Sequence, residues 1–246
     1  MSRMKNEQER LFHWSEESIK WYKIAAEQQE YHQNLARIIL SKLPQEPSIC
    51  DMGCGVGYLS LALASRAKAI MSVDLNQTAI QVLKDNILKN ELTNVSTLVG
   101  DFELISRPKQ PFDAIVMCLF GDLTEFMNKA REWTDNKIIY IMSTNSRRIF
   151  TATKESTQGN TEEEIADFLN KNNYTFEVEQ ISLPFGQPLK SIEEGIKFIR
   201  HYDSKSTDEE IKKLLKSKLI SSSSYQYPYY FPNEKKLAMF VIDPSK

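Results

Sequence analysis

The amino-acid sequence predicts an α/β fold in which helices cover both faces of a mainly parallel β-sheet. Between residues 48 and 143, short apolar runs alternate with amphipathic segments, as repeated strand–helix–strand units require. The strand candidates of this stretch are SICDMG, AIMSVD, NVSTLVGD, FDAIVMC and KIIYIM. Because a parallel sheet is normally buried on both faces, we expect a three-layer sandwich.

Length and composition are those of an ordinary globular protein. The chain has 246 residues, of which 41% are hydrophobic and 26% are charged, which suits one large domain with a modest insertion. The formal net charge of −2 argues against a strongly basic nucleic-acid-binding protein. A local basic patch is still compatible with this balanced total, so RNA remains an alternative partner.

Cysteine usage and the lack of long apolar runs indicate the compartment. Cys50, Cys54 and Cys118 have neither disulfide nor metal-ligand spacing, which is typical of a reducing compartment, and we expect buried thiols without a metal. The first residues lack a secretory-signal pattern, and no run is apolar enough to span a bilayer. We therefore expect a cytoplasmic protein that does not enter membranes.

Residues 1–44 are predicted to form a helical cap segment on a domain made of residues 45–246. Residues 15–43 fit one long helix, with Ser15 as its N-cap and Pro44 after its end. A shorter helix is predicted around Leu11 to Trp14. The apolar face of the long helix contains Ile19, Tyr22, Leu35, Ile38 and Ile39.

Residues 186–232 are predicted to form a helical insertion before the last strand, LAMFVID. A capping box at Thr161–Glu164 begins a helix that leads into the strand candidate YTFEVEQISL. The insertion has its own capping boxes at Ser191–Glu194 and Thr207–Glu210, each followed by apolar residues at helical spacing. It ends in SSSSYQYPYYFP, whose tyrosines are Tyr225, Tyr227, Tyr229 and Tyr230.

The segment ICDMGCGVG carries the main chemical signal. A strand ends at Asp51, glycines follow at Gly53, Gly55 and Gly57, and the next strand ends at Asp74, a position suited to binding ribose hydroxyls. The third glycine of the dinucleotide fingerprint would stand where the chain has a tyrosine, and a pyrophosphate beside Asp51 would be repelled. The pattern therefore favours a cationic nucleoside, S-adenosylmethionine (SAM), over NAD.

These motifs resemble those of class I SAM-dependent methyltransferases through residues 48–143. DMGCGVG resembles the family's first motif, Gly100-Asp101-Phe102 its adenine-contacting segment, and Phe112-Asp113 with AIVMC its fourth strand. The resemblance implies a Rossmann-like, seven-stranded, mostly parallel sheet whose last strand, LAMFVID, is antiparallel. It also implies methyltransferase activity with SAM as the cofactor.

The resemblance assigns roles at the carboxyl ends of the strands. Gly53, Gly55 and Gly57 would line the methionine moiety, with Asp51 near its ammonium directly or through water. Asp74 would bind the ribose hydroxyls, Leu75 would pack on the adenine ring, Asp101 would accept from its amino group, and the Phe102 backbone would meet a ring nitrogen. Cys118 and Leu119 would face the methyl group. CLFGD after the fourth strand lacks the prolines of adenine-N6, glutamine and cytosine-C5 methyltransferases, which disfavours those chemistries.

The sequence determines neither the acceptor nor the oligomeric state. We expect a small-molecule acceptor, with residues 11–35 and 186–232 around the methyl group; RNA, a protein, and non-catalytic SAM binding are the alternatives. His13, His32 and His201 each lie in a polar or amphipathic helix, which favours surface positions. The catalytic candidates are His32, with Tyr31 and Tyr22 near it, and Asp122, which also fits the N-cap of a helix at Leu123.

Overall fold

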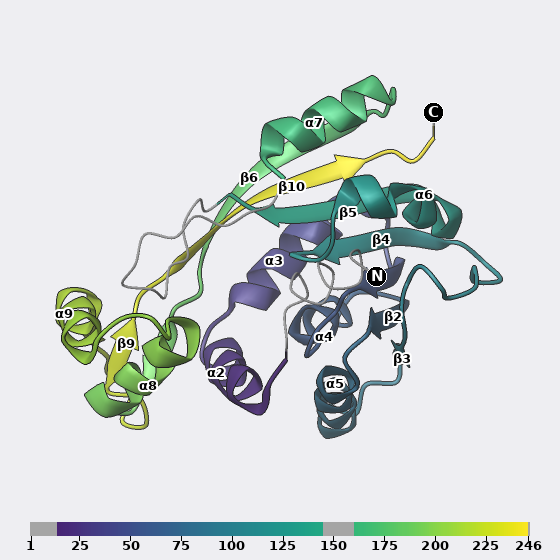
Figure 1. Ribbon diagram of the computed structural model, residues 1–246. Helices are drawn as coiled ribbons and strands as arrows, with labels where there is room; N and C mark the ends of the chain where they lie inside the picture. The colour runs from purple at the N-terminus through teal and green to yellow at the C-terminus, as the bar shows by residue number, and fades with distance from the viewer. Residues whose placement is uncertain (1–13, 145–159, 246) are drawn as a thin grey trace, which may run out of the picture.

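The computed structural model describes residues 14–144 and 160–245. Its main sheet has seven strands in the order β3-β2-β1-β4-β5-β10-β6 (Figure 1). Strands β1 to β5 are parallel, and β10 runs antiparallel to both β5 and β6, which confirms the expected topology. The strands are β1 (Ser48–Met52), β2 (Ala69–Asp74), β3 (Val95–Val99), β4 (Phe112–Cys118), β5 (Thr134–Ser143), β6 (Phe176–Pro184) and β10 (Glu234–Ile242).

Two apolar cores on opposite faces of the sheet give the three layers. Side chains alternate along each strand, so Ile49 belongs to one core and Cys50 to the other. The helices α3 (Tyr31–Leu40) and α4 (Tyr58–Leu63) contribute to the first core, and α6 (Leu123–Trp133) and α7 (Glu162–Lys171) to the second. Helix α5 (Gln77–Lys89) packs against β2 and β3. No helix in the described ranges is long and apolar enough to cross a membrane.

The single long helix predicted for residues 15–43 is wrong, because the segment forms α2 (Glu16–Glu27) and then α3. Ser15 caps α2 as expected. In the break, the Gln29 amide exchanges hydrogen bonds with the backbone of Gly186, at 2.7 and 3.0 Å, and accepts from the Tyr230 hydroxyl at 2.8 Å. These long-range hydrogen bonds stabilise the turn between α2 and α3. No proline or glycine in the turn itself predicts it. The helix predicted around residues 11–14 lies mostly outside the described residues.

The insertion contains the two predicted helices, α8 (Ile192–Tyr202) and α9 (Asp208–Lys218), and a second sheet that was not predicted. This sheet has the order β7-β9-β8 and consists of β7 (Gln187–Leu189), β8 (Ile220–Ser221) and β9 (Tyr229–Phe231). In Figure 1, α8, α9 and β9 lie together at one end of the molecule, next to α2. Trp21 of α2 is 1% exposed, and its ring packs edge-on against the Phe198 ring, with 5.4 Å between the centroids. Helix α2 therefore completes the small core of the insertion.

The predicted helix caps agree with the structure in all but one detail. Thr161 and Thr207 form complete capping boxes with Glu164 and Glu210. Ser191 accepts from the Glu194 amide, but the Glu194 carboxylate accepts from Lys190 instead of closing the box.

Candidate functional site

The glycine turn after β1 lies at the carboxyl edge of the sheet. Gly53, Gly55 and Gly57 have φ values of 69°, 54° and 78°, which L side chains rarely adopt. The amide of Gly53 donates to the Val73 carbonyl at 2.8 Å, so the turn is fixed to the end of β2. A Cβ atom at Gly53 would lie 2.1 Å from the Phe120 ring, and one at Gly55 would lie 2.6 Å from the Trp14 ring. Two aromatic rings therefore lie directly on this turn.

Asp74 ties the end of β2 to the glycine turn. Its carboxylate accepts from the Gly55 amide at 2.7 Å and from the Asn76 amide at 2.8 Å. The N-cap of α5 is Asn76, whose side chain accepts from Ala79 at 2.9 Å, so Asp74 is not a helix cap. Burial raises the pKa of Asp74, and the two amide hydrogen bonds partly offset this rise.

Asp51 is a buried carboxylate under the same turn. It is 2% exposed and accepts from the Ser60 hydroxyl at 2.5 Å, and the Ser72 hydroxyl donates to Ser60 at 2.8 Å. Burial raises the pKa of Asp51 to about 6, against the lowering effect of the Ser60 hydrogen bond and with a further rise from the Asp74 charge. Near neutral pH this group holds a negative charge that a bound cation would stabilise.

The other predicted cofactor residues end the neighbouring strands. The Asp101 carboxylate accepts from the Glu103 amide at 2.9 Å, and the Gly100 amide donates to the Asp74 carbonyl at 3.0 Å. Leu75 and Leu119 are 48% and 46% exposed, and Leu119 has a φ of 54°. The Phe102 ring is buried against Trp133, at 4.5 Å between centroids, so its backbone is what it can offer a ligand.

The thiols are less buried than expected. Cys50 is buried, whereas Cys54 and Cys118 are partly exposed. Cys118 ends β4 in the middle of the edge, and burial raises its pKa to about 12.

An aromatic cluster stands beside the glycine turn and contains Tyr22, Tyr31, His32, Tyr58 and Phe185. The His32 ring contacts the other four, and the Phe185 ring has centroid distances of 5.3 Å to Tyr22, 4.6 Å to Tyr31 and 5.5 Å to His32. The Tyr22 hydroxyl lies 2.8 Å from the His32 Nε2 atom. Tyr22 also packs edge-on against the Trp14 ring, so the cluster and the turn are continuous.

His32 corrects the expectation of a surface histidine. It is 3% exposed, and burial lowers its pKa to about 3, so the imidazole is neutral. In the described part of the chain, its Nδ1 atom and the Tyr31 hydroxyl are buried and have no hydrogen-bond partner. Such groups are expensive to bury, and a bound molecule would satisfy them. His201 is exposed, and His13 lies outside the described residues.

The remaining acceptor candidates lie elsewhere. Asp122 is the N-cap of α6 and accepts from the Thr124 amide at 2.9 Å. Of the loop tyrosines, Tyr225 is exposed, Tyr229 packs on the core of the insertion, and Tyr230 binds Gln29. Tyr227 is 8% exposed, with the Lys190 ammonium 5.8 Å from its ring centroid, so the four tyrosines have different environments.

Sequence reasoning missed five residues of this region: Trp14, Tyr58, Phe120, Phe185 and Lys235. Phe120 stands in CLFGD, directly after the fourth strand, and this position was a usable signal. Phe185 and Lys235 flank the insertion, and only the pairing of β6 with β10 brings them to this edge.

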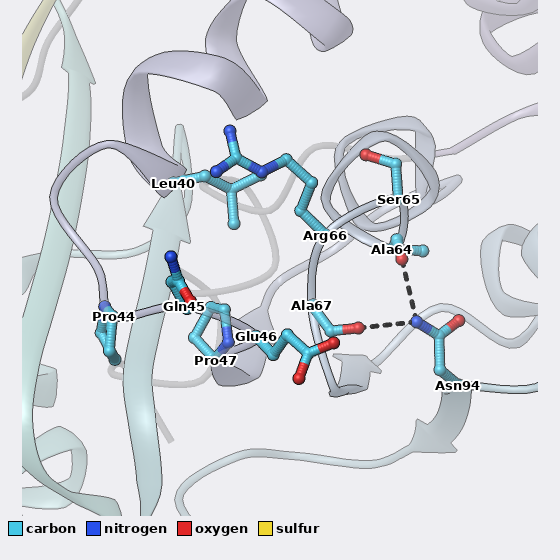
Figure 2. A pocket seen from close by; sticks show the side chains of 10 residues that line it. All are labelled: Leu40, Pro44, Gln45, Glu46, Pro47, Ala64, Ser65, Arg66, Ala67 and Asn94. Atoms are coloured by element: carbon cyan, nitrogen blue, oxygen red, sulfur yellow. Dashed lines mark hydrogen bonds between the residues drawn. The ribbon is translucent and has the colours of Figure 1, made fainter.

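Two cavities lie outside the carboxyl edge. One, of about 490 Å³, lies before the amino end of β1. There the side-chain amide of Asn94 donates to the Ala64 and Ala67 carbonyls, both at 2.9 Å (Figure 2). A second hollow, of about 1100 Å³, is a groove between α2, α3, α4 and α5 with Tyr58 in its wall. We call it the α3–α5 groove; its charged lining residues are Glu27, Glu30, Arg37, Arg66 and Lys89.

Known proteins share the sequence and the fold of this region. The chain is 35% identical over 95 residues to the tRNA (guanine(37)-N(1))-methyltransferase Trm5b of Pyrococcus abyssi, covering 38% of this chain and 28% of that protein. It is 31% identical over 85 residues to a probable ribosomal RNA small subunit methyltransferase A of Methanosphaera stadtmanae, covering 34% and 31%. The aligned segment thus spans less than a third of each of these relatives.

The solved structure of the YcgJ protein from Bacillus subtilis has the same fold, with a TM-score of 0.54 at 14% identity over 87% of this chain and 98% of that one. The model of the TRM5/TYW2 methyltransferase domain matches residues 20–166, which is more than half of the chain. This chain therefore belongs to the TRM5/TYW2 methyltransferase domain family and is an enzyme that uses S-adenosylmethionine as its cofactor.

Proposed function

We propose that this methyltransferase modifies a nucleobase of RNA. Both curated relatives described above act on RNA by their names, which favours the alternative of our sequence-based expectation over the small molecule that we placed first. Membership of an enzyme family also argues against non-catalytic SAM binding.

In this proposal the cofactor lies along the carboxyl edge. Asp74 binds the ribose hydroxyls, the Asp101 segment meets the adenine, and Asp51 stabilises the ammonium of the methionine moiety from beneath the turn. The Asp74 carboxylate already accepts two hydrogen bonds from backbone amides, and its remaining lone pairs are free for hydroxyl donors. The Trp14 and Phe120 rings lie directly against the glycine turn. Where the methionine moiety occupies the same space, these rings have to move away from the turn.

The observation that carries the acceptor proposal is a set of partly exposed rings beside the glycine turn, namely Trp14, Tyr22 and Tyr58. Enzymes that act on a base of RNA take it out of the stack and hold it between flat side chains. Tyr58 also lines the α3–α5 groove, so one continuous surface connects the rings to the cations Arg66 and Lys89. These cations would bind phosphates of the strand that carries the base.

Incubation of the purified protein with radiolabelled SAM tests this proposal. Total tRNA, total ribosomal RNA and a metabolite extract are offered in parallel, and the products are treated with ribonuclease before separation. Label that is released as a modified nucleoside supports RNA as the acceptor, and label confined to the metabolite fraction contradicts it.

Charge variants in the groove sharpen the test. The double variant Arg66→Ala/Lys89→Ala removes two groove cations, and Lys212→Ala/Lys213→Ala removes two exposed lysines of α9 as the matched control. We expect a higher KM for RNA and a weaker salt dependence only in the groove variant. Equal behaviour of the two variants would place the RNA elsewhere.

A small organic acceptor is the second candidate, because part of the aromatic cluster is enclosed. Tyr31, His32 and Phe185 are 3%, 3% and 6% exposed, between the cap segment 1–44 and the start of the insertion 186–232. We propose that these two segments serve as the acceptor-binding parts of the enzyme in either case. The metabolite arm of the same assay decides between the two classes of acceptor.

A further inference from the structure

Lys235 reaches the carboxyl edge because β10 is antiparallel to its neighbours. The strand begins at Glu234, and its first residues pair near the end of β5, where the Thr144 amide donates to the Lys236 carbonyl at 2.9 Å. The Lys235 ammonium lies over the Phe185 ring, 5.9 Å from its centroid. This places a lysine against the Phe185 side of the aromatic cluster.

No carboxylate balances this lysine within the described ranges. The side chain is partly buried and forms no ion pair there, and the titratable groups that face it are Cys118 of β4 and His32 of α3. Both neighbours are neutral at physiological pH, since burial raises the pKa of the thiol and lowers that of the imidazole. Burial in this apolar setting also lowers the pKa of Lys235, so a second cation bound beside it displaces the proton of this ammonium more readily than that of an exposed lysine.

We propose that Lys235 is the general base that takes the proton from the methyl acceptor. This proposal rests on the proposed function, and it selects acceptors that carry an N–H or O–H at the methylated atom. The acceptor proton moves to the lone pair of the Lys235 Nζ atom. The electron pair of the acceptor atom then bonds to the methyl carbon, and the carbon–sulfur bond breaks with its electrons going to sulfur.

The charges at the edge favour this assignment. A bound sulfonium would lie near Cys118, and release of the Lys235 proton on binding would avoid repulsion between two cations. After transfer, the sulfur is a neutral thioether and Lys235 carries the positive charge, so the site keeps one positive charge throughout. The reaction moves that charge from the cofactor to the lysine.

Other titratable groups of the cluster are less suited to this role. The Nε2 atom of His32 is already in a hydrogen bond with the Tyr22 hydroxyl, and an imidazole whose pKa is about 3 binds a proton weakly. The pKa values of Tyr22 and Tyr31 are raised by burial, so their phenols stay protonated. The Asp51 carboxylate lies beneath the glycine turn, where the proposed function assigns it to the ammonium of the cofactor.

The test uses the full-length protein and three variants. Lys235→Arg keeps a positive charge that cannot be removed, Lys235→Met removes the amine, and Lys236→Met is the control at the exposed neighbouring position. The first readout is calorimetry of SAM and S-adenosylhomocysteine binding in buffers of different ionisation heat. We expect SAM, but not S-adenosylhomocysteine, to release a proton from the wild type and from Lys236→Met, and Lys235→Met to lose this difference.

The second readout is single-turnover methyl transfer. We expect both Lys235 variants to be slower by about 100-fold to 10,000-fold, with arginine no better than methionine. Turnover of Lys235→Arg within tenfold of the wild type, or equal proton release with the two ligands, overturns the proposal. Melting curves identify a misfolded variant, and Lys235→Arg still decides the question if Lys235→Met is unstable. A wild type that binds no SAM would instead refute the assignment of the cofactor, and label confined to the metabolite fraction would refute RNA as the acceptor.

Discussion

Asp51 offers a quantitative test of the site, because its carboxylate is held in a buried position at a cost to stability. We predict that the difference in unfolding free energy between the wild type and Asp51→Asn changes with pH. Asparagine keeps an oxygen for the Ser60 hydroxyl but cannot ionise. Its amide group adds a constant offset to stability, so the change with pH, not the offset, carries the prediction.

The magnitude follows from the shift in pKa. The pKa of Asp51 rises from 3.8 to about 6 on folding, and each unit corresponds to about 1.4 kcal/mol. Because the pKa of this acid is raised, the folded state binds more protons than the unfolded state between these values. The wild type therefore loses about 3 kcal/mol relative to Asp51→Asn as pH rises from about 4 to above 6, and nothing further beyond that.

Chemical denaturation of both proteins across this pH range measures the effect. For a chain of this size, about 3 kcal/mol corresponds to a relative change in Tm of roughly 6–12 °C. Stability curves that stay parallel between the acid and the neutral end would refute the reasoning, because Asp51 would then titrate normally. Saturating SAM should shrink the difference at neutral pH, since the ammonium stabilises the wild-type carboxylate alone.

Three further predictions concern the cofactor site and the cap. Asp74→Ala should weaken SAM binding by roughly 1.5–3 kcal/mol in calorimetry, because charge-assisted hydrogen bonds to the ribose are lost. Unchanged affinity would leave Asp74 with only its hydrogen bonds to the Gly55 and Asn76 amides. Gln29→Ala should lower stability by about 3 kcal/mol in denaturation, through the loss of three hydrogen bonds of about 1 kcal/mol each, whereas the exposed Gln28→Ala should not. S-adenosylhomocysteine should change the tryptophan fluorescence in the wild type but much less in Trp14→Phe, and an equal change in both would show that Trp14 does not move.

The fold was largely predictable because its signals are local. Apolar strands and glycine turns predict the parallel sheet, and the capping boxes at Thr161 and Thr207 predict where two helices begin. The break between α2 and α3 was not predictable, because it depends on Gln29 meeting Gly186, 157 positions away in the chain. The short strands of the insertion were missed for a related reason, since each is only two or three residues long and pairs across loops.

The candidate site divides in the same way. Asp51 and Asp74 follow strands directly, and the carboxyl ends of parallel strands meet at one edge, so their proximity follows from the order of the sequence. Phe185 and Lys235 come from segments whose local pattern says nothing about chemistry. Their position depends on the antiparallel register of β6 with β10, where Lys235 pairs with Leu183. Residues that bind a shared cofactor are thus easier to predict than residues that meet the acceptor.

Several groups that are costly to bury lie together at this edge, although Trp21, Asn86 and Trp133 also have buried nitrogen atoms without a hydrogen-bond partner in the described ranges. Helix ends elsewhere are satisfied by their caps, as at Thr161 and Thr207. At the carboxyl edge, by contrast, a buried carboxylate has one hydroxyl partner, and the Tyr31 hydroxyl and the His32 Nδ1 atom have none within the described ranges. Each such group lowers the stability of the free protein. A bound cofactor and acceptor supply the cation and the polar atoms that these groups lack, so ligand binding and stability are coupled at this edge.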